Sequence, residues 1–277
     1  MRINKFISES GVCSRREADQ WISAGRVTCN GAPATLGTRI GPNDEVCVDG
    51  ARLGARRAAV YIALNKPVGI TSTSEAQVEG NIVDLVGHEQ RIFPVGRLDK
   101  DSEGLILLTN DGDIVNEILR AENNHEKEYD VTVDRPITEM TLALLRDGVR
   151  IMGRMTRGCR VERIGAQRFR IILTEGLNRQ IRRMCSALGY RVRRLQRVRI
   201  SNILLGSLAP GQWRNLTQEE LAALLPQRFS APAGVHSQRS VSAPTPSVQR
   251  RAAAARQSGS SALPANQRKK SGPWPDQ

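Results

Sequence analysis

The sequence predicts an α+β protein with two folded domains and a disordered basic tail. In its first part, a helix-start signal runs directly into signals for tight hairpins. Between residues 60 and 227, short apolar strands alternate with helical patterns. From Arg228 onward Ala, Ser, Pro, Gln and Arg dominate, which is typical of disorder. We therefore expect domains over residues 1–55 and 60–227, and a tail over 228–277 that adds weak, salt-sensitive affinity for RNA.

The N-terminal domain begins with a predicted helix. Ser14 and Glu17 form a capping box, and Gly25 is expected to end the helix. The pairs Asn30–Gly31 and Asp49–Gly50 are strong signals for hairpin turns. This order of signals predicts a small module of helix and hairpins.

Three arginines of this module are left for solvent or phosphate once the apolar helix face is buried, namely Arg15, Arg16 and Arg26. A structural cap with a solvated basic face is one interpretation, and a helix-turn-helix DNA reader is another. The chain runs directly into strands without a second recognition helix, which argues against the DNA reader.

The second domain is expected to follow a linker over residues 51–59, which have no strong periodicity. Residues 61–65 predict a strand and residues 66–69 a tight turn. Further along, Asp113 is expected to cap a helix. In the segment 125–133, alternation places Tyr129 at the inward-facing start of a strand, where a tyrosine is more often a packing residue than a catalyst.

The loop from Gly96 to Gly104 lies between the apolar segments 92–95 and 105–108, which predict buried strands. A loop held at both ends is a good place for chemistry. Arg97 and Asp99 share this framework, and an aspartate beside fixed cations is available as a nucleophile or base. A turn with a surface ion pair explains the same residues equally well.

A helix is expected over residues 178–188, with one apolar and one cationic stripe. The cationic stripe consists of Arg179, Arg182 and Arg183. These arginines have no acidic neighbours in the helix and would repel one another, so an anionic partner, either phosphate or a buried carboxylate, explains them best. Arginines between 191 and 199 are expected to continue this basic surface.

The formal charge of +13 and the pI of about 10.4 favour a polyanionic partner. The tail from residue 228 contributes +7, so the rest of the chain is itself basic at +6. Nucleic acid is the expected partner. No apolar run could span a membrane and no export signal is apparent, so we expect a cytoplasmic protein. The five cysteines never form a Cys-x-x-Cys pair, which argues against disulfides and zinc.

Two resemblances extend this interpretation. The order of features from Arg2 to Gly31 resembles the S4-like RNA-binding domain of a ribosomal protein. Behind it, Gly96-Arg97-Leu98-Asp99, Lys127-Glu128-Tyr129 and the segment 176–184 resemble the motifs of ribosomal RNA pseudouridine synthases that carry such a domain. The residues of the second and third motifs are most similar to those of the branch that acts on 23S ribosomal RNA near the peptidyl-transferase centre.

The resemblance implies a catalytic domain on a largely antiparallel mixed sheet, RNA bound across a basic cleft, and no cofactor or metal. Asp99 matches the family nucleophile, Tyr129 the active-site tyrosine and Arg182 the arginine that pairs with the aspartate. The expected partner is 23S ribosomal RNA or the assembling large subunit, bound by a monomer. The residues expected to bind RNA are Arg15, Arg16, Arg26, Arg97, Lys100, Asn178, Arg179, Gln180 and Arg183.

Other interpretations remain open at this point. A non-catalytic RNA-binding assembly factor could use the same cleft, and 16S ribosomal RNA or a transfer RNA could be the substrate. Glycoside hydrolysis by Asp99 with Asp101 or Glu103 is disfavoured by the many arginines and few aromatic residues. On this view neither Asp101 nor Glu103 needs a role beyond turn formation and solvation.

Overall fold

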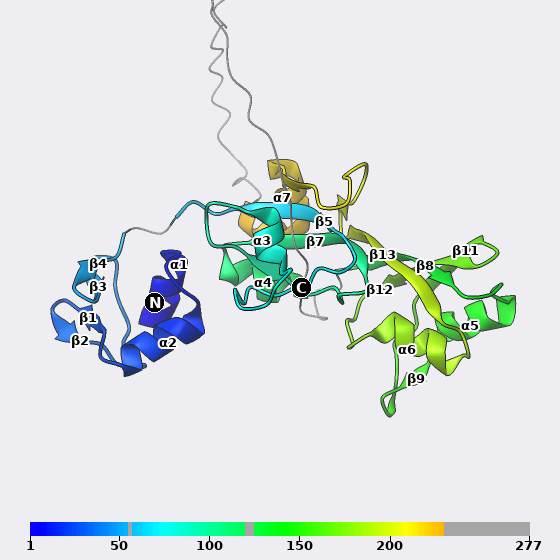
Figure 1. Ribbon diagram of the computed structural model, residues 1–277, viewed down its shortest axis with the longest axis horizontal. Coiled ribbons are helices and arrows are strands. Elements are labelled where there is room, and N and C mark those ends of the chain that lie inside the picture. Colours follow the sequence, from blue (N-terminus) through cyan, green and yellow to red (C-terminus); the bar gives the residue numbers. More distant parts are fainter. Residues whose placement is uncertain (55–56, 120–124, 230–277) are drawn as a thin grey trace, which may run out of the picture. The chain divides into compact units, whose positions relative to one another are not determined.

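A computed structural model describes residues 1–54, 57–119 and 125–229. Its first part is a small module of two helices and a four-stranded antiparallel sheet in the order β2-β1-β3-β4 (Figure 1). Its elements are α1 (Ile3–Glu9), α2 (Arg15–Ser23), β1 (Val27–Cys29), β2 (Ala32–Pro33), β3 (Val46–Val48) and β4 (Ala51–Arg52).

Local signals in this module are confirmed. Ser14 accepts from the Glu17 amide while the Glu17 carboxylate accepts from the Ser14 amide, so the expected capping box opens α2. Asn30 and Gly31 both have positive φ, as the turn between β1 and β2 requires. The expected linker over residues 51–59 is shorter than predicted, because residues 51 and 52 pair with β3 as strand β4.

The second part is built on a sheet of nine strands with the central order β11-β12-β8-β13-β7-β5-β15, to which β6 and β14 add at β7 and β13. All pairings are antiparallel except that of β13 with β7, so the expected α+β class and largely antiparallel sheet are confirmed. The strands are β5 (Tyr61–Lys66), β6 (Phe93–Val95), β7 (Glu103–Thr109), β8 (Lys127–Val133), β11 (Arg160–Gly165), β12 (Arg168–Leu173), β13 (Val192–Ile200), β14 (Ile203–Leu204) and β15 (Trp213–Asn215), beside a separate hairpin of β9 (Arg150–Ile151) and β10 (Arg154–Met155).

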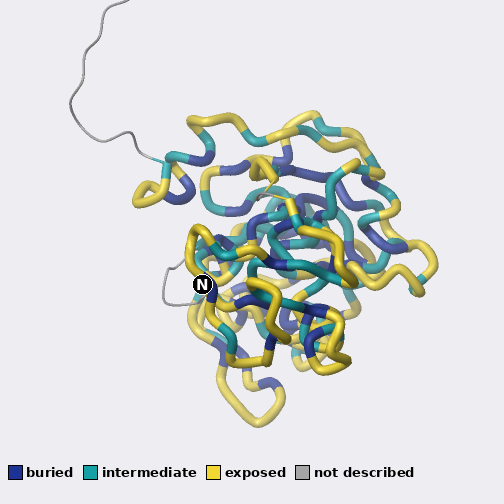
Figure 2. Tube along the Cα trace, turned by 90° about the vertical axis from the view of Figure 1, so that its left-hand side faces the viewer, coloured by how far each residue is buried: buried dark blue, intermediate teal, exposed yellow. Residues whose placement is uncertain are grey.

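Helices cover the two halves of this sheet differently. They are α3 (Ile82–Val86), α4 (Gly112–Leu119), α5 (Glu139–Asp147), α6 (Gln180–Ala187), α7 (Gln218–Leu224) and α8 (Pro226–Phe229). On β7, Ile106 and Leu108 pack with α3, whereas Leu105 and Leu107 pack with α4 and α7, so this half is covered on both faces. In the other half, α5 and α6 pack against one face of β8, β12 and β13. Figure 2 shows the resulting pattern, with buried strand segments and exposed turns.

The halves meet where β7 and β13 run parallel, paired at Glu103 with Gln196 and at Gly104 with Arg197. Gly104 has φ of +102°, and a Cβ atom there would lie 2.3 Å from the Arg197 carbonyl oxygen. Only glycine permits this approach. Lys66 and Tyr129 extend the same row, since Lys66 pairs with Gly104 and Tyr129 with Arg197.

Several sequence-based expectations need correction. Lys66 is not in a turn but is the fully buried last residue of β5. Asp113 lies inside α4, and the Asp111 carboxylate accepts from its amide at 3.1 Å. Arg197 does not continue a basic surface, because its side chain is buried and donates to the Leu105 carbonyl at 2.6 Å.

The predicted tail begins within a helix, since Arg228 and Phe229 belong to α8. Arg228 pairs with Glu117 at 2.7 Å, which holds this end of the chain to α4. The rest of the predicted tail, residues 230–277, lies outside the described residues. Within the described ranges, none of the helices combines the length and apolar character needed to cross a membrane.

Candidate active site

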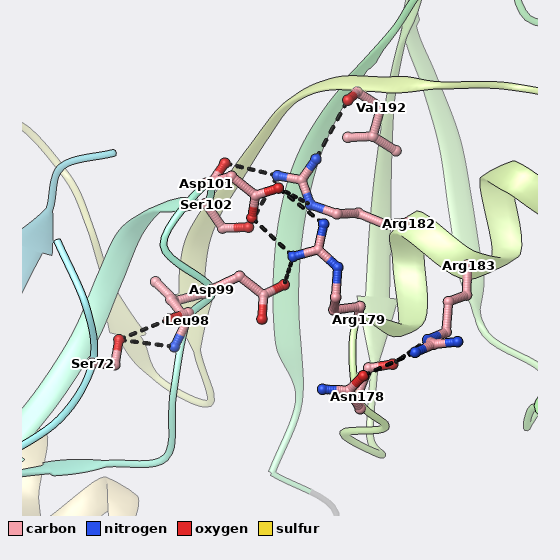
Figure 3. A network of polar contacts seen from close by, with 10 residues as sticks. All are labelled: Ser72, Leu98, Asp99, Asp101, Ser102, Asn178, Arg179, Arg182, Arg183 and Val192. Carbon is pink, nitrogen blue, oxygen red and sulfur yellow. Dashed lines mark hydrogen bonds and ion pairs between the residues drawn. The ribbon is translucent and has the colours of Figure 1, made fainter. Parts of the chain in front are cut away.

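Asp99 lies in the loop between β6 and β7, and the backbone before it is fixed by a side chain from a distant segment. The buried Ser72 hydroxyl donates to the Leu98 carbonyl at 2.8 Å and accepts from the Leu98 amide at 3.2 Å (Figure 3). The Ser102 amide donates to the Asp99 carbonyl at 3.0 Å and closes the turn. Asp99 is therefore held on both sides, although the sequence pattern gives no sign of Ser72.

The Asp99 carboxylate is about a third exposed, with 30% of the side chain accessible, and forms an ion pair with Arg179 at 3.2 Å. Arg179 also binds Asp101 through two hydrogen bonds of 3.1 and 2.9 Å. These bonds are the main cause that lowers the pKa of the Asp101 carboxyl below its usual range. Arg179 thus joins the two aspartates of the loop.

Arg182 does not pair with Asp99, contrary to the expectation from sequence. Its guanidinium donates to the Asp101 carbonyl at 2.7 Å and to the Ser102 hydroxyl at 3.1 Å, and its Nε lies 3.5 Å from the Asp101 carboxylate (Figure 3). A further bond of 3.3 Å reaches the Val192 carbonyl. Arg182 therefore fixes the end of the loop rather than the carboxylate of Asp99.

The start of α6 explains why Arg179, and not Arg182, pairs with Asp99. The helix was expected over residues 178–188 but spans Gln180–Ala187, and Arg179 is its N-cap residue in the left-handed region, with φ of 51°. Arg179 is therefore not in a helical stripe with Arg182 and Arg183, and its side chain points to the Asp99 loop.

Two predicted RNA-binding residues of this segment make local contacts instead. Arg183 donates to the carbonyl and the side-chain oxygen of Asn178, each at 3.1 Å, and points away from Asp99. Gln180 is buried, with its amide group bonded to the Leu177 amide and the Glu175 carboxylate. Both ends of the Gln180 side chain are used within the protein, and its binding of RNA stays a prediction.

A pocket of about 300 Å³ opens beside Asp99. Tyr129, from β8, lines it together with Arg97, Asn178 and Arg179. The Tyr129 ring packs against the apolar cores of both halves of the sheet, and its hydroxyl has no hydrogen-bond partner among the described residues. The structure thus brings Asp99 and Tyr129 together in one pocket, which Arg182 and Arg183 do not line.

Comparison with known proteins identifies the family. The family model for RNA pseudouridylate synthase matches residues 60–187, and that for the S4 domain matches residues 1–46. The dual-specificity RNA pseudouridine synthase RluF of Escherichia coli (strain K12) is 55% identical over 226 residues, which are 81% of this chain and 78% of that protein. The chain belongs to the RNA pseudouridine synthases.

Two further comparisons agree. An uncharacterized RNA pseudouridine synthase of Aquifex aeolicus (strain VF5) is 38% identical over 236 residues, covering 81% of this chain and 93% of that one. A crystal structure of a pseudouridylate synthase matches with a TM-score of 0.61 and 29% identity, over 81% of this chain and all of that one. The resemblance inferred from the three motifs and the N-terminal module is confirmed.

The synthase has a second carboxylate in the pocket, that of Glu175. It accepts hydrogen bonds from the Arg157 amide at 3.0 Å and from Gln180 at 2.7 Å. Asp99, with one ion-pair partner, is therefore the freer of the two carboxylates. Among the residues described, no cluster of His, Cys, Asp and Glu is arranged to hold a metal ion.

The remaining predicted RNA-binding residues differ in their surroundings. Arg97 and Lys100 are exposed beside Asp99, and neither side chain forms a hydrogen bond or ion pair with the part of the chain that the structure describes. Arg15 and Arg16 are exposed on the S4 domain. Arg26 instead binds Asp49 at 3.0 Å and lies 5.0 Å above the Trp21 ring, so it is already engaged.

The sequence also missed roles for two acidic residues. Asp101 holds Arg179 and Arg182, and Glu103 on β7 pairs with Arg194 on β13. Both were expected to be solvated turn residues. Their partners lie about 80 to 90 positions away in the chain, so local periodicity carries no signal for them.

Proposed function

We propose that this synthase isomerises a specific uridine of 23S ribosomal RNA near the peptidyl-transferase centre, with Asp99 as its catalytic carboxylate. The observation that carries the assignment of Asp99 is its place in the same pocket as Tyr129, with 30% of its side chain accessible. The substrate class rests on the residues of the second and third motifs and on the relatives named RluF.

The chemistry requires that the uridine leaves the RNA stack. The bond from N1 to C1′ breaks, the uracil turns, and a bond from C5 to C1′ forms, while the C5 proton is lost and N1 regains a proton. Asp99 either attacks C1′ or removes a proton from the sugar to assist the departure of the base. Tyr129 stacks on the extruded uracil and assists removal of the C5 proton, and Arg179 orients Asp99 during these steps.

Arg182 acts in this scheme as a positioning residue. Its bonds to Asp101 and Ser102 hold the end of the loop that carries Asp99. The S4 domain supplies RNA affinity through Arg15 and Arg16. We further propose that the synthase acts as a cytoplasmic monomer, and that its domains divide near residues 55–60 and 227–230.

The RluF relatives are named as dual-specificity enzymes, which supports testing a transfer RNA as a second substrate of this chain. Mapping pseudouridine in ribosomal and transfer RNA from cells with and without the protein identifies the modified uridines. A map that is unchanged in 23S ribosomal RNA but changed in another RNA would refute 23S ribosomal RNA as the substrate, while the proposed isomerisation of uridine would stand.

The catalytic assignment is tested by Asp99→Asn, with release of tritium from C5-labelled uridine as the assay. We expect isomerisation to be abolished and RNA affinity to be nearly unchanged, because the lost charge acts on the sugar in the reaction and does not bind phosphate. Asp147→Asn, exposed on α5, is the matched control and should keep the parental rate. Turnover by Asp99→Asn near that rate would refute the assignment. Chelation of divalent ions should not affect the parent beyond RNA folding.

A further inference from the structure

Two additional pockets adjoin the one that holds Asp99, each through different lining residues. The first, of about 500 Å³, shares Arg97, Leu98 and Asp99 with the central pocket. The second, of about 520 Å³, shares only Arg179 with it. The two outer pockets have no lining residue in common, so each is connected to the other only through the central pocket. Asp99 lies on the border with the first outer pocket, and Arg179 lies on the border with the second.

The first outer pocket combines hydroxyl groups, an aromatic ring and unpaired cations. Thr71, Thr73 and Ser74 line it together with the half-buried ring of Phe93. Lys100 also lines it and is exposed, without an ion-pair partner in the described residues. Hydroxyls and a cation bind ribose and phosphate, and an aromatic ring is a surface for a base. This combination suits a whole nucleotide.

The second outer pocket is strongly cationic. Four arginines line it against one carboxylate, that of Asp134, which is occupied by the Arg191 amide at 2.9 Å. Arg135 is held flat, since its guanidinium lies 4.6 Å above the Tyr190 ring and donates to the Gly189 carbonyl at 2.6 Å. The Arg191 guanidinium has no partner within the described ranges. Preorganised and unpaired arginines favour phosphate.

We propose that these pockets hold the RNA on the two sides of the target uridine: the Thr71–Ser74 pocket binds a nucleotide on one side, and the Arg135–Arg191 pocket binds a backbone phosphate on the other. The strand then crosses the Asp99 loop and the uridine turns into the central pocket. This inference rests on the proposed function for the identity of the central nucleotide, but it makes a separate statement about where the flanking RNA lies.

The test combines variants of the protein with shortened RNA. The variants are Lys100→Gln and Arg191→Gln, with Arg163→Gln as the control, an arginine of β11 that lines none of the three pockets and removes the same charge. The probe is the tightest-binding of a set of short RNA fragments tiled across the peptidyl-transferase region of 23S ribosomal RNA. Two shortened probes lack the flank on the 5′ or on the 3′ side of the uridine.

We expect Lys100→Gln and Arg191→Gln each to weaken binding of the intact probe by about threefold to tenfold, and Arg163→Gln by less than about twofold. Removing one flank should abolish the penalty of one variant only, and removing the other flank should abolish that of the other. Sensitivity of both variants to the same flank, to neither flank, or no penalty at all would overturn the proposal.

The assay measures affinity alone, so the result does not depend on turnover. Tight binding with this flank pattern but without tritium release from the probe would refute the proposed function and uphold the pockets. Release of tritium without the flank pattern would refute the two flanking pockets and uphold the proposed function.

Discussion

Replacing Arg179 by alanine separates the contact with Asp99 from the other interactions of the loop. Arg179 holds both Asp99 and Asp101, so the single variant perturbs two pairs at once. In an Asp101→Ala background only the pair with Asp99 remains for Arg179 among the described residues. The further change Arg179→Ala then reports on that pair alone.

The magnitude follows from exposure. The Arg179 and Asp99 side chains are 41% and 30% exposed, so solvent screens their interaction to about 0.5–1 kcal/mol. We therefore expect Arg179→Ala to lower the single-turnover rate at saturating RNA by about two- to fivefold in the Asp101→Ala background. Arg182 is 13% exposed and makes three hydrogen bonds, so its loss should cost about 2–3 kcal/mol of stability.

The assays are rapid-quench tritium release and urea denaturation of the same variants. Arg183→Ala, which removes only contacts to Asn178 in its own segment, is the control and should keep the rate at saturating RNA. If Arg179→Ala leaves the rate unchanged in this background while Arg182→Ala abolishes it in a folded protein, the contact with Asp99 has no function and the reasoning from geometry fails.

The single variant Arg179→Ala, with Asp101 in place, changes the dependence of stability on pH. Because Arg179 holds the pKa of Asp101 below its usual value of 3.8, ionised Asp101 contributes stability above that pH and the contribution is lost as the pH falls through the folded pKa. Since Asp101 is about half exposed, Arg179→Ala should remove less than about 1 kcal/mol at neutral pH and flatten the acid limb of the stability curve.

Three further predictions concern the framework of the site. Deleting residues 1–55 should weaken RNA binding more than the single-turnover rate at saturating RNA; a collapse of that rate in a folded protein would show that the S4 domain helps to form the active site. Gly104→Ala should lower the free energy of unfolding by at least about 3 kcal/mol, because its Cβ atom would meet the Arg197 carbonyl, whereas Gly153→Ala, with open space around it, should lose only about 1–2 kcal/mol; equal losses in chemical denaturation would contradict this. Burial lowers the pKa of Lys66 to about 8 in the folded protein, whereas the unfolded chain keeps this proton up to about pH 10.5. The free energy of unfolding should therefore rise by up to about 3 kcal/mol between these two pH values because of this site. Lys66→Met should remove that rise in denaturation curves measured at neutral pH and near pH 9.5, and an unchanged rise would assign it to another group.

The features that the sequence predicted are those decided by near neighbours in the chain. The capping box at Ser14 and the turn at Asn30–Gly31 each depend on residues within four positions, and a short apolar run sufficed to place the strand that becomes β7. The resemblance to the family motifs predicted that Asp99 and Tyr129 belong to one site, and both residues line the same pocket. The contacts that hold this pocket escaped prediction because they join distant segments, as with Ser72 and Leu98.

The arginines near the site illustrate the limit most clearly, because charge patterns do not distinguish an arginine that binds phosphate from one that crosslinks the fold. Arg179, Arg182, Arg194 and Arg197 all belong to the half of the sheet that carries Tyr129, and all bind the loop or strand of the other half, which carries Asp99. The parallel contact between the halves is only two residue pairs long. These four side chains therefore supply much of the directional bonding that sets the position of Asp99 relative to Tyr129. Lys100 and Arg191 have no such partners among the described residues, and they are the ones that we propose to bind RNA.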